Sequence, residues 1–224
     1  NTDSKYVPKA FNDTEKLKAY AAANPGKRFL QKLWSNRGIS LKKVEEMNFD
    51  VFGPGYKYFG QEYIENPLLI DGYKFDFGIY VLVSSVDPLR IYYYEKNTLI
   101  RLCAEKYDPN NFTNVDTYVI SDACIFPWDL DALSVYYNQS YTYKESLNAY
   151  LTKNGYEVGR IWTQVEDCIR DMVVRKEEHF KYWVRSEVFL SLLKITNFSF
   201  SFVATPTSTH SSSFSDSISS SIMT

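Results

Sequence analysis

The chain has 224 residues, of which 45% are hydrophobic and 17% aromatic, and its formal net charge at neutral pH is −2. So many aromatic residues exclude a disordered protein, and the length allows one large domain or two small ones. The near-neutral charge gives no support to a nucleic-acid partner, because nucleic-acid-binding domains carry basic surfaces. No apolar run approaches the ~20 residues of a membrane-spanning helix, so we expect no membrane span.

The first half of the chain predicts one helix followed by short strands. Residues 12–25 predict the helix, with Asn12 or Asp13 as its N-cap, and Pro25-Gly26 ends it. The connections between the later strands are short, which predicts antiparallel neighbours. The expected strands lie at 28–33, 56–63, 74–85, 89–95 and 98–103.

The second half predicts helices and then a tail of low complexity. Residues 104–142 are rich in Asp, Asn and Pro and predict irregular structure. Helices are expected at 143–154 and from 160 to about 185, and apolar residues in the second recur at the spacing of a core-facing helix. Serine and threonine dominate the end of the chain, so we expect residues 196–224 to be a disordered Ser-rich tail.

Cysteine and histidine are too few and too scattered for the common catalytic and metal sites. The three cysteines, Cys103, Cys124 and Cys168, are odd in number and form no C-x-x-C pair. We therefore expect buried or idle thiols in a reducing compartment, without zinc and without a disulfide framework. Two histidines, His179 and His210, poorly serve a histidine metal site or a Ser-His-Asp triad.

Charged residues share one face of the expected strand 74–85. Side chains alternate along a strand, so Lys74, Asp76 and Gly78 lie on the face opposite to the aromatic residues between them. Burying such charges without partners costs several kcal/mol, so this face needs water, an ion pair or a polar ligand. From the residues alone, a surface salt bridge worth roughly 0–1 kcal/mol and a ligand site both stay open.

Four motifs, in a fixed order, resemble those of a known family. They read QEYI at 61–64, PLLIDGYKFD at 67–76, DPLR at 87–90 and EKY at 105–107. In these motifs the chain resembles the tubulin-tyrosine-ligase-like family, and it looks most similar to the divergent fifteenth numbered branch. Family members look like ATP-grasp ligases that add amino acids to tubulin tails. The resemblance implies an α+β, ATP-grasp-like fold with a mostly antiparallel sheet flanked by helices.

The resemblance covers about residues 5–185 and implies how the chain is divided. Residues 5–142 would form the central ATP-grasp subdomain, and residues 143–195 the helical start of the C-terminal one. The match begins at Tyr6-Val7-Pro8-Lys9, after the family's N-terminal domain. We therefore expect a family member that is truncated at both ends.

The resemblance also implies ATP and Mg²⁺ as cofactors and places an ATP site on this chain. Tyr63 and Ile64 would contact adenine through their backbone, because N–H and C=O groups match the adenine edge. Lys74 would reach adenine or phosphate and Asp76 the ribose, since a lysine supplies a point charge against phosphate. The implied ATP-binding residues are Lys32, Gln61, Glu62, Tyr63, Ile64, Lys74 and Asp76.

Arg101 stands where the resemblance implies an arginine for the carboxylate of the incoming amino acid, a task that suits a bidentate guanidinium. The alternative for Arg101 is a cross-strand pair with an exposed acid. The alternative for Lys32 is a solvated lysine at a strand end. Glu105 and Lys106 are expected to hold the following loop.

Departures from the family pattern gather at the phosphate end of the implied site. The covering loop keeps Arg37 and Gly38 but lacks the second glycine of the family's R-G-x-G-I pattern, so it should hold phosphate less well. Gly78 stands where the family has an arginine for the γ-phosphate. After Arg185 no strand offers the aspartate and E-x-N pair that hold magnesium, the main electrostatic stabiliser of phosphoryl transfer.

Two functions therefore stay open. The first is a fragment of an ATP-dependent tubulin amino-acid ligase of the glutamylase type, which works through an acylphosphate. This fragment would itself be inactive, because the metal ligands are missing. The second is a non-catalytic, pseudoenzyme-like module that binds tubulin or another partner. The family implies tubulin or microtubules as the partner and a cytoplasmic, cytoskeleton-associated location.

Overall fold

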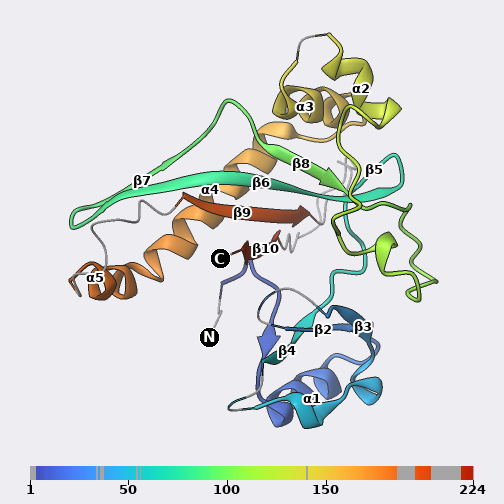
Figure 1. The fold of residues 1–224 in the computed structure, drawn as a ribbon, viewed down its shortest axis with the longest axis vertical. Helices are drawn as coiled ribbons and strands as arrows, with labels where there is room; N and C mark the ends of the chain where they lie inside the picture. The colour runs from blue at the N-terminus through green and yellow to red at the C-terminus, as the bar shows by residue number, and fades with distance from the viewer. Residues whose placement is uncertain are drawn as a thin grey trace, which may run out of the picture.

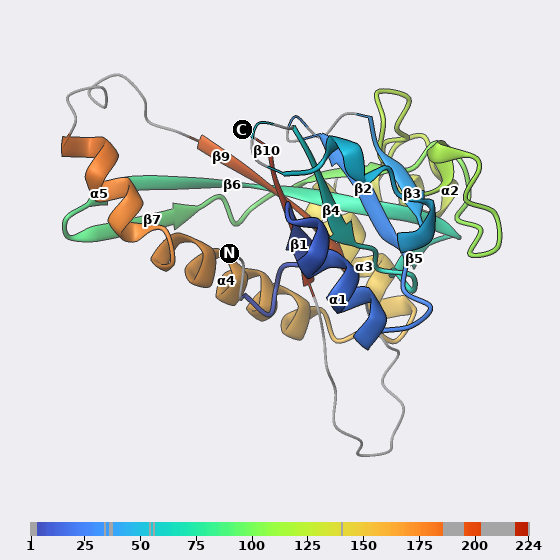
Figure 2. The ribbon, with the colours of Figure 1, turned by 90° about the horizontal axis from the view of Figure 1, so that it is seen from below.

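The computed structural model describes residues 4–185, 195–202 and 218–223, except residues 34, 36, 37, 54, 56 and 140. Two antiparallel sheets dominate these residues, and each carries helices on one face (Figures 1 and 2). The smaller sheet and helix α1 (Thr14–Ala23) lie at one end of the molecule, and helices α2 (Asp131–Tyr137) and α3 (Tyr143–Lys153) lie at the other (Figure 1).

The smaller sheet has the strand order β1-β4-β2-β3 and packs against helix α1. Leu17 of the helix and Phe29 of the sheet are fully buried between them. Gly60 permits this close contact, because a Cβ atom there would lie 2.8 Å from the Leu17 side chain. The elements are β1 (Ala10–Phe11), α1 (Thr14–Ala23), β2 (Phe29–Leu33), β3 (Ser40–Lys42), the 3₁₀ turns Val44–Glu46 and Phe49–Val51, and β4 (Tyr58–Glu62).

The larger sheet is built around one long strand, β6 (Tyr73–Val86). β9 pairs with one edge of β6, while β7 and β8 pair with the opposite edge one after the other. β10 extends the sheet beyond β9. The other strands are β5 (Leu69–Ile70), β7 (Leu89–Tyr93), β8 (Leu99–Leu102), β9 (Ile195–Phe202) and β10 (Ile218–Met223).

The main hydrophobic core lies between the larger sheet and the helices α3 (Tyr143–Lys153) and α4 (Val158–Val174). Phe75 and Phe77 of β6 are almost fully buried there, and the ring centroids of Phe77 and Trp162 lie 5.2 Å apart. Strand alternation therefore turns the aromatic residues of β6 toward the helices and leaves its polar residues on the other face.

The expected helix at 12–25 and the five expected strands are present, with ends shifted by a few residues. Asp13 is the N-cap of α1 and accepts a hydrogen bond from the Lys16 N–H at 3.0 Å. The expected irregular region 104–142 also contains helix α2 (Asp131–Tyr137) and a 3₁₀ turn at Val115–Thr117. These short elements were missed because they span too few residues to show a hydrophobic period.

The prediction of a single helix from 160 to about 185 is wrong. Two helices, α4 and α5 (Glu177–Arg185), occupy this range. The Lys176 N–H donates to the Val173 carbonyl at 3.0 Å, three residues back, which tightens and ends the last turn of α4. The sequence does not reveal this break, because no glycine or proline, the usual signals of a helix end, stands there.

The expected disorder of residues 196–224 is wrong for two segments, because β9 pairs with β6 and β10 pairs with β9. The β9 sequence alternates Phe and Ser, a period of two that is typical of a strand, and the free edge of β6 offers it backbone groups to pair with. Residues 203–217 and 224 of the tail lie outside the described residues, as do residues 186–194.

The mixed architecture, with antiparallel sheets and flanking helices, agrees with the expected fold class. The division between residues 142 and 143 stays a prediction. Along the described ranges, no helix combines the length and apolar character needed to cross a bilayer.

Candidate functional site

The two sheets meet where the small-sheet face opposite α1 approaches the start of β6. Lys32 lies on this face of β2, directly across from Phe59 on β4, and its Nζ is 5.2 Å from the Phe59 ring centroid. Lys74, at the start of β6, places its Nζ 5.7 Å from the ring centroid of Tyr63, which follows β4. We call the region formed by Lys32, Phe59, Tyr63 and Lys74 the lysine seam.

Lys32 is only 6% exposed. Burial, and secondarily the positive charge of Lys74, lowers the pKa of Lys32 from 10.5 to about 8. This side chain is therefore buried, unlike the solvated strand-end lysine considered from the sequence.

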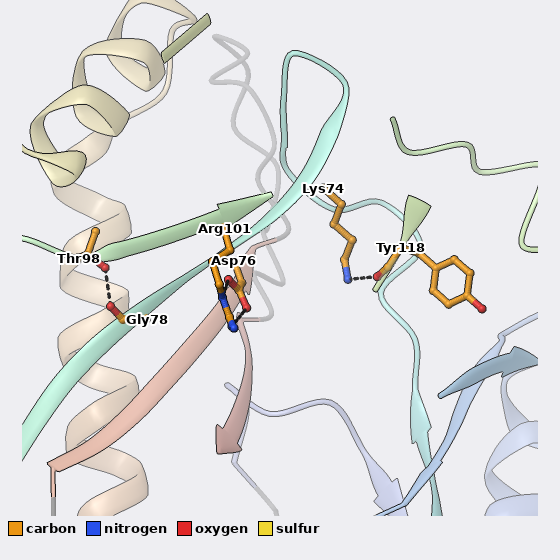
Figure 3. Close-up of polar contacts among 6 residues, drawn as sticks. All are labelled: Lys74, Asp76, Gly78, Thr98, Arg101 and Tyr118. Atoms are coloured by element: carbon orange, nitrogen blue, oxygen red, sulfur yellow. Dashed lines mark hydrogen bonds and ion pairs between the residues drawn. The ribbon is translucent and has the colours of Figure 1, made fainter. Parts of the chain in front are cut away.

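Lys74 is held by a backbone group from a distant part of the chain. Its Nζ donates a hydrogen bond to the Tyr118 carbonyl at 2.9 Å (Figure 3). Burial lowers the pKa of Lys74, although Cys103 and Asp76 nearby act in the opposite direction. Within the described ranges, neither Lys32 nor Lys74 has a carboxylate at ion-pair distance. Among the described residues, these two desolvated amines thus share one seam without a carboxylate counter-ion.

Asp76 and Arg101 form a bidentate pair across β6 and β8 (Figure 3). The Arg101 Nε donates to Asp76 Oδ1 at 3.1 Å, and its Nη2 donates to Oδ2 at 2.6 Å. Residues directly opposite in a sheet are closer than residues two apart on one strand, which explains why Asp76 pairs with Arg101 and not with Lys74. The cross-strand pair considered for Arg101 is present, but its acid is 6% exposed and so buried, not exposed.

The expected adenine hinge, Gln61 to Ile64, begins at the end of β4, an inner strand of the small sheet, and continues into the seam. The Glu62 carboxylate points toward α1, where it accepts hydrogen bonds from the Tyr20 hydroxyl at 2.8 Å and from Lys27. The Tyr63 N–H donates to the Arg28 carbonyl at 2.9 Å, whereas the Ile64 N–H has no hydrogen bond to any described residue. The roles of these residues toward a nucleotide stay predictions.

The expected phosphate end is only partly described. Arg37 lies outside the described residues, and Gly38 has a φ of 60°, in the left-handed region that favours glycine. Gly78 lies on the same face of β6 as Asp76, and its carbonyl accepts a hydrogen bond from the Thr98 hydroxyl at 2.7 Å (Figure 3). Gly78, which stands where the resemblance implies an arginine for the γ-phosphate, is thus a strand position whose carbonyl is hydrogen-bonded.

The described residues do not fit a magnesium site, because among them no three or more His, Cys, Asp or Glu side chains gather in a way that could hold a metal ion. Asp76, the carboxylate that the sequence places in the site, already receives the Arg101 guanidinium. We therefore assign no step of a reaction to a metal held by these residues.

Sequence reasoning missed the contribution of the region 104–142 to the site. Tyr118 supplies the carbonyl that holds Lys74, and its ring packs edge-on against Tyr63 with centroids 6.2 Å apart. Phe112 packs against both tyrosines, and the Arg28 guanidinium lies over the Phe112 ring. The high aromatic content of the chain was the only available signal, and it does not say which rings meet.

Comparison with known proteins agrees with the expected family. The model of the tubulin-tyrosine ligase family matches residues 5–189. The chain is 38% identical over 170 residues to the probable tubulin polyglutamylase ttll-15 of Caenorhabditis elegans, covering 74% of this chain and 32% of that protein. It is 31% identical over 159 residues to the mouse tubulin polyglutamylase TTLL6, covering 68% of this chain and 19% of that protein.

A third relative, the probable beta-tubulin polyglutamylase of Tetrahymena thermophila, is 30% identical over 164 residues, covering 65% of this chain and 13% of the relative. The chain thus spans about a third or less of the length of these relatives. The nematode relative is named ttll-15, which agrees with the fifteenth numbered branch of the family that the motifs of this chain resemble. Because the family model covers most of the chain, this protein belongs to the tubulin-tyrosine ligase family.

Proposed function

We propose that this chain is the nucleotide-binding part of an ATP-dependent tubulin amino-acid ligase of the glutamylase type. Its family and the names of its relatives, which are tubulin polyglutamylases, support the class of reaction. The observation that carries the nucleotide site is the lysine seam, where Lys32 and Lys74 are desolvated and have no described carboxylate partner.

A polyphosphate suits these two amines for electrostatic reasons. Each buried ammonium has lost hydration, and the charge of Lys74 further disfavours protonation of Lys32. A phosphate chain between them would replace repulsion by two charge-assisted hydrogen bonds. Binding would then raise the pKa of Lys32, so nucleotide should bind together with a proton at pH near 8.

The remaining residues take their proposed roles around this anion site. The Ile64 N–H is a backbone donor for adenine, next to the buried Tyr63 ring. Arg101 would bind the carboxylate of the incoming amino acid, and Asp76 would hold the guanidinium in position through its bidentate contact. The acceptor would be a carboxylate of a tubulin tail, activated as an acylphosphate in the complete enzyme at microtubules.

Isothermal titration of the chain with Mg-ATP tests the nucleotide site. We expect binding in the micromolar range, and about 10- to 100-fold weaker binding for Lys74→Ala and for Lys32→Ala, because each loses a charge-assisted hydrogen bond. Lys106→Ala is the matched control, since Lys106 also lies over a tyrosine ring but is exposed and paired with Asp71. The affinity of Lys106→Ala for Mg-ATP should equal that of the wild type.

Two further readouts sharpen this test. At pH 8 the measured heat should depend on the ionisation enthalpy of the buffer in the wild type and lose most of that dependence in Lys32→Ala. No heat at millimolar Mg-ATP from protein that is folded by circular dichroism would contradict the proposal, and so would equal affinities for Lys74→Ala and Lys106→Ala.

We further propose that these residues alone bind nucleotide without turnover, because the described part of the chain offers no magnesium set. This observation also favours the second candidate, a non-catalytic module that binds tubulin or another partner. Incorporation of labelled glutamate into tubulin by the 224-residue chain with Mg-ATP would refute the proposed lack of turnover. Sedimentation with microtubules that is indifferent to ATP, together with absent nucleotide binding, would favour the non-catalytic module.

A further inference from the structure

Two cysteines from separate parts of the chain meet beside the lysine seam. Leu102, at the end of β8, exchanges both backbone hydrogen bonds with Ile125, at 2.9 and 3.0 Å, in an antiparallel bridge. The residues next to such a hydrogen-bonded pair face each other as a non-hydrogen-bonded pair, with Cα atoms about 4.5 Å apart and side chains on the same face. On the side of the bridge that follows Leu102, those residues are Cys103 and Cys124.

The backbone on the other side of Cys103 supports the same arrangement. The Cys103 N–H points away from Cys124 and donates to the Lys74 carbonyl at 2.8 Å. Lys74, Cys103 and Cys124 therefore form a row across three neighbouring segments. The Asp76–Arg101 pair lies in the adjacent row of the same face. Both thiols thus lie directly beside the candidate site.

The two thiols differ in access. Cys103 is fully buried, whereas Cys124 is partly exposed. Burial raises the pKa of the Cys103 thiol to about 11. Burial also raises the pKa of Cys124, but the positive charge of Arg101 opposes this shift. Cys124 is therefore the thiol that an oxidant reaches first.

We propose that Cys103 and Cys124 form a reversible disulfide, which makes this face of the molecule a site of thiol oxidation. The Cα separation of a non-hydrogen-bonded pair, about 4.5 Å, falls at the short end of the range found for disulfides, about 4.4–6.8 Å. The side chains start from one face, so no large backbone movement is needed. The spacing of the cysteines along the chain did not indicate this pair.

The oxidant is a small disulfide of the glutathione class. The Cys124 thiolate attacks one sulfur of glutathione disulfide, whose S–S bond breaks and releases one glutathione thiolate. The Cys103 sulfur then attacks the mixed disulfide and releases the second glutathione. Two protons and two electrons leave the protein thiols and end on two molecules of glutathione, so the exchange balances.

The bridge would close the loop 104–123, which contains Tyr118, the residue whose carbonyl holds Lys74. A cross-link at the base of a loop restricts its unfolding. Oxidation would therefore fix this loop against β8, and we expect slower proteolysis within 104–123 and a higher midpoint of thermal unfolding.

Peptide mapping of the wild-type chain tests the proposal and requires no nucleotide. The folded protein is equilibrated with glutathione disulfide, then denatured and alkylated without reductant. We expect one alkylated cysteine, Cys168, and a linked peptide that joins Cys103 to Cys124 and disappears after treatment with dithiothreitol. Cys168 serves as the internal reference because it is buried in the helical core, where its Sγ lies 3.6 Å from Met172 Sδ.

Two variants complete the test. Cys168→Ser should still give the linked peptide, and Cys124→Ser should not; the latter changes a partly exposed side chain and so avoids a defect in the core. The proposal is overturned if the folded wild type keeps three alkylatable thiols, if glutathione stays attached to Cys124 while Cys103 remains alkylatable, or if disulfide-linked dimers form in place of the intramolecular bridge.

Discussion

The two faces of β6 use one strand in two physically different ways. The face toward the helices carries Phe75, Phe77 and Ile79, which are buried in a continuous apolar core. The opposite face carries Lys74, which donates to the Tyr118 carbonyl, and Asp76, which pairs with Arg101. An apolar face needs only neighbours of suitable shape, whereas a polar face needs a particular atom at a particular place.

This difference also explains why the polar face resembles a site. The Tyr118 carbonyl comes from the region 104–142 and binds Lys74, while Arg101 of β8 binds Asp76 (Figure 3). Thr98, directly before β8, donates to the backbone carbonyl of Gly78, the next residue along the same face. Convergence of this kind fixes charged groups in defined orientations, which is what recognition of a polar ligand requires.

The largest expected effect is on the apolar face. Phe77→Ala should lower the free energy of unfolding by about 3–5 kcal/mol, because it leaves a cavity against Trp162. Urea titration followed by circular dichroism measures this loss. The control is Tyr80→Ala on the opposite face of β6, where the side chain is 46% exposed and the expected change is within about 0.5 kcal/mol. Similar losses for both variants would remove the distinction between the faces.

An intermediate effect is expected for the buried ion pair. Asp76→Asn should destabilise the protein by about 3 kcal/mol, because the largely buried Arg101 guanidinium loses the counter-charge of Asp76. The double variant Asp76→Asn with Arg101→Gln replaces the pair by two neutral amides and should recover most of this loss. If urea titration shows that Asp76→Asn is as stable as the wild type, the Asp76–Arg101 pair contributes no more to stability than a surface salt bridge does.

The smallest expected effect is a gain in stability on removing a buried charge. The pKa of Lys32 is lowered to about 8 from 10.5, so the unfolded chain binds its proton more tightly. Below pH 8 the charge costs up to about 3 kcal/mol, and this cost disappears as the pH rises from 8 to 10.5. Lys32→Met should therefore unfold with a free energy about 2 kcal/mol higher at pH 7.

Comparison of Lys32→Met with the wild type at two pH values isolates this contribution from the tyrosines and cysteines that also titrate above pH 8. The difference between the two proteins should be much smaller at pH 10 than at pH 7. An equal difference at both pH values would mean that packing, and not the charge of Lys32, is responsible.

Local patterns in the sequence predicted the elements that depend on local physics. Capping by Asp13 predicted the start of α1, and the strand period predicted β6 and the shared face of Lys74, Asp76 and Gly78. The break between α4 and α5 and the pairing of β9 with β6 were not foreseen. Both depend on contacts or hydrogen bonds that no local period records.

Four ordered motifs are sufficient to identify the family, and strand alternation is sufficient to separate the two faces of β6. Which groups meet on the polar face depends on the folded chain. Lys74 finds its carbonyl 44 positions away and Asp76 its guanidinium 25 positions away. The register of separate strands sets such partners, as it does for Cys103 and Cys124. Register follows from the packing of the whole sheet, because a slip by one residue would turn every side chain to the other face.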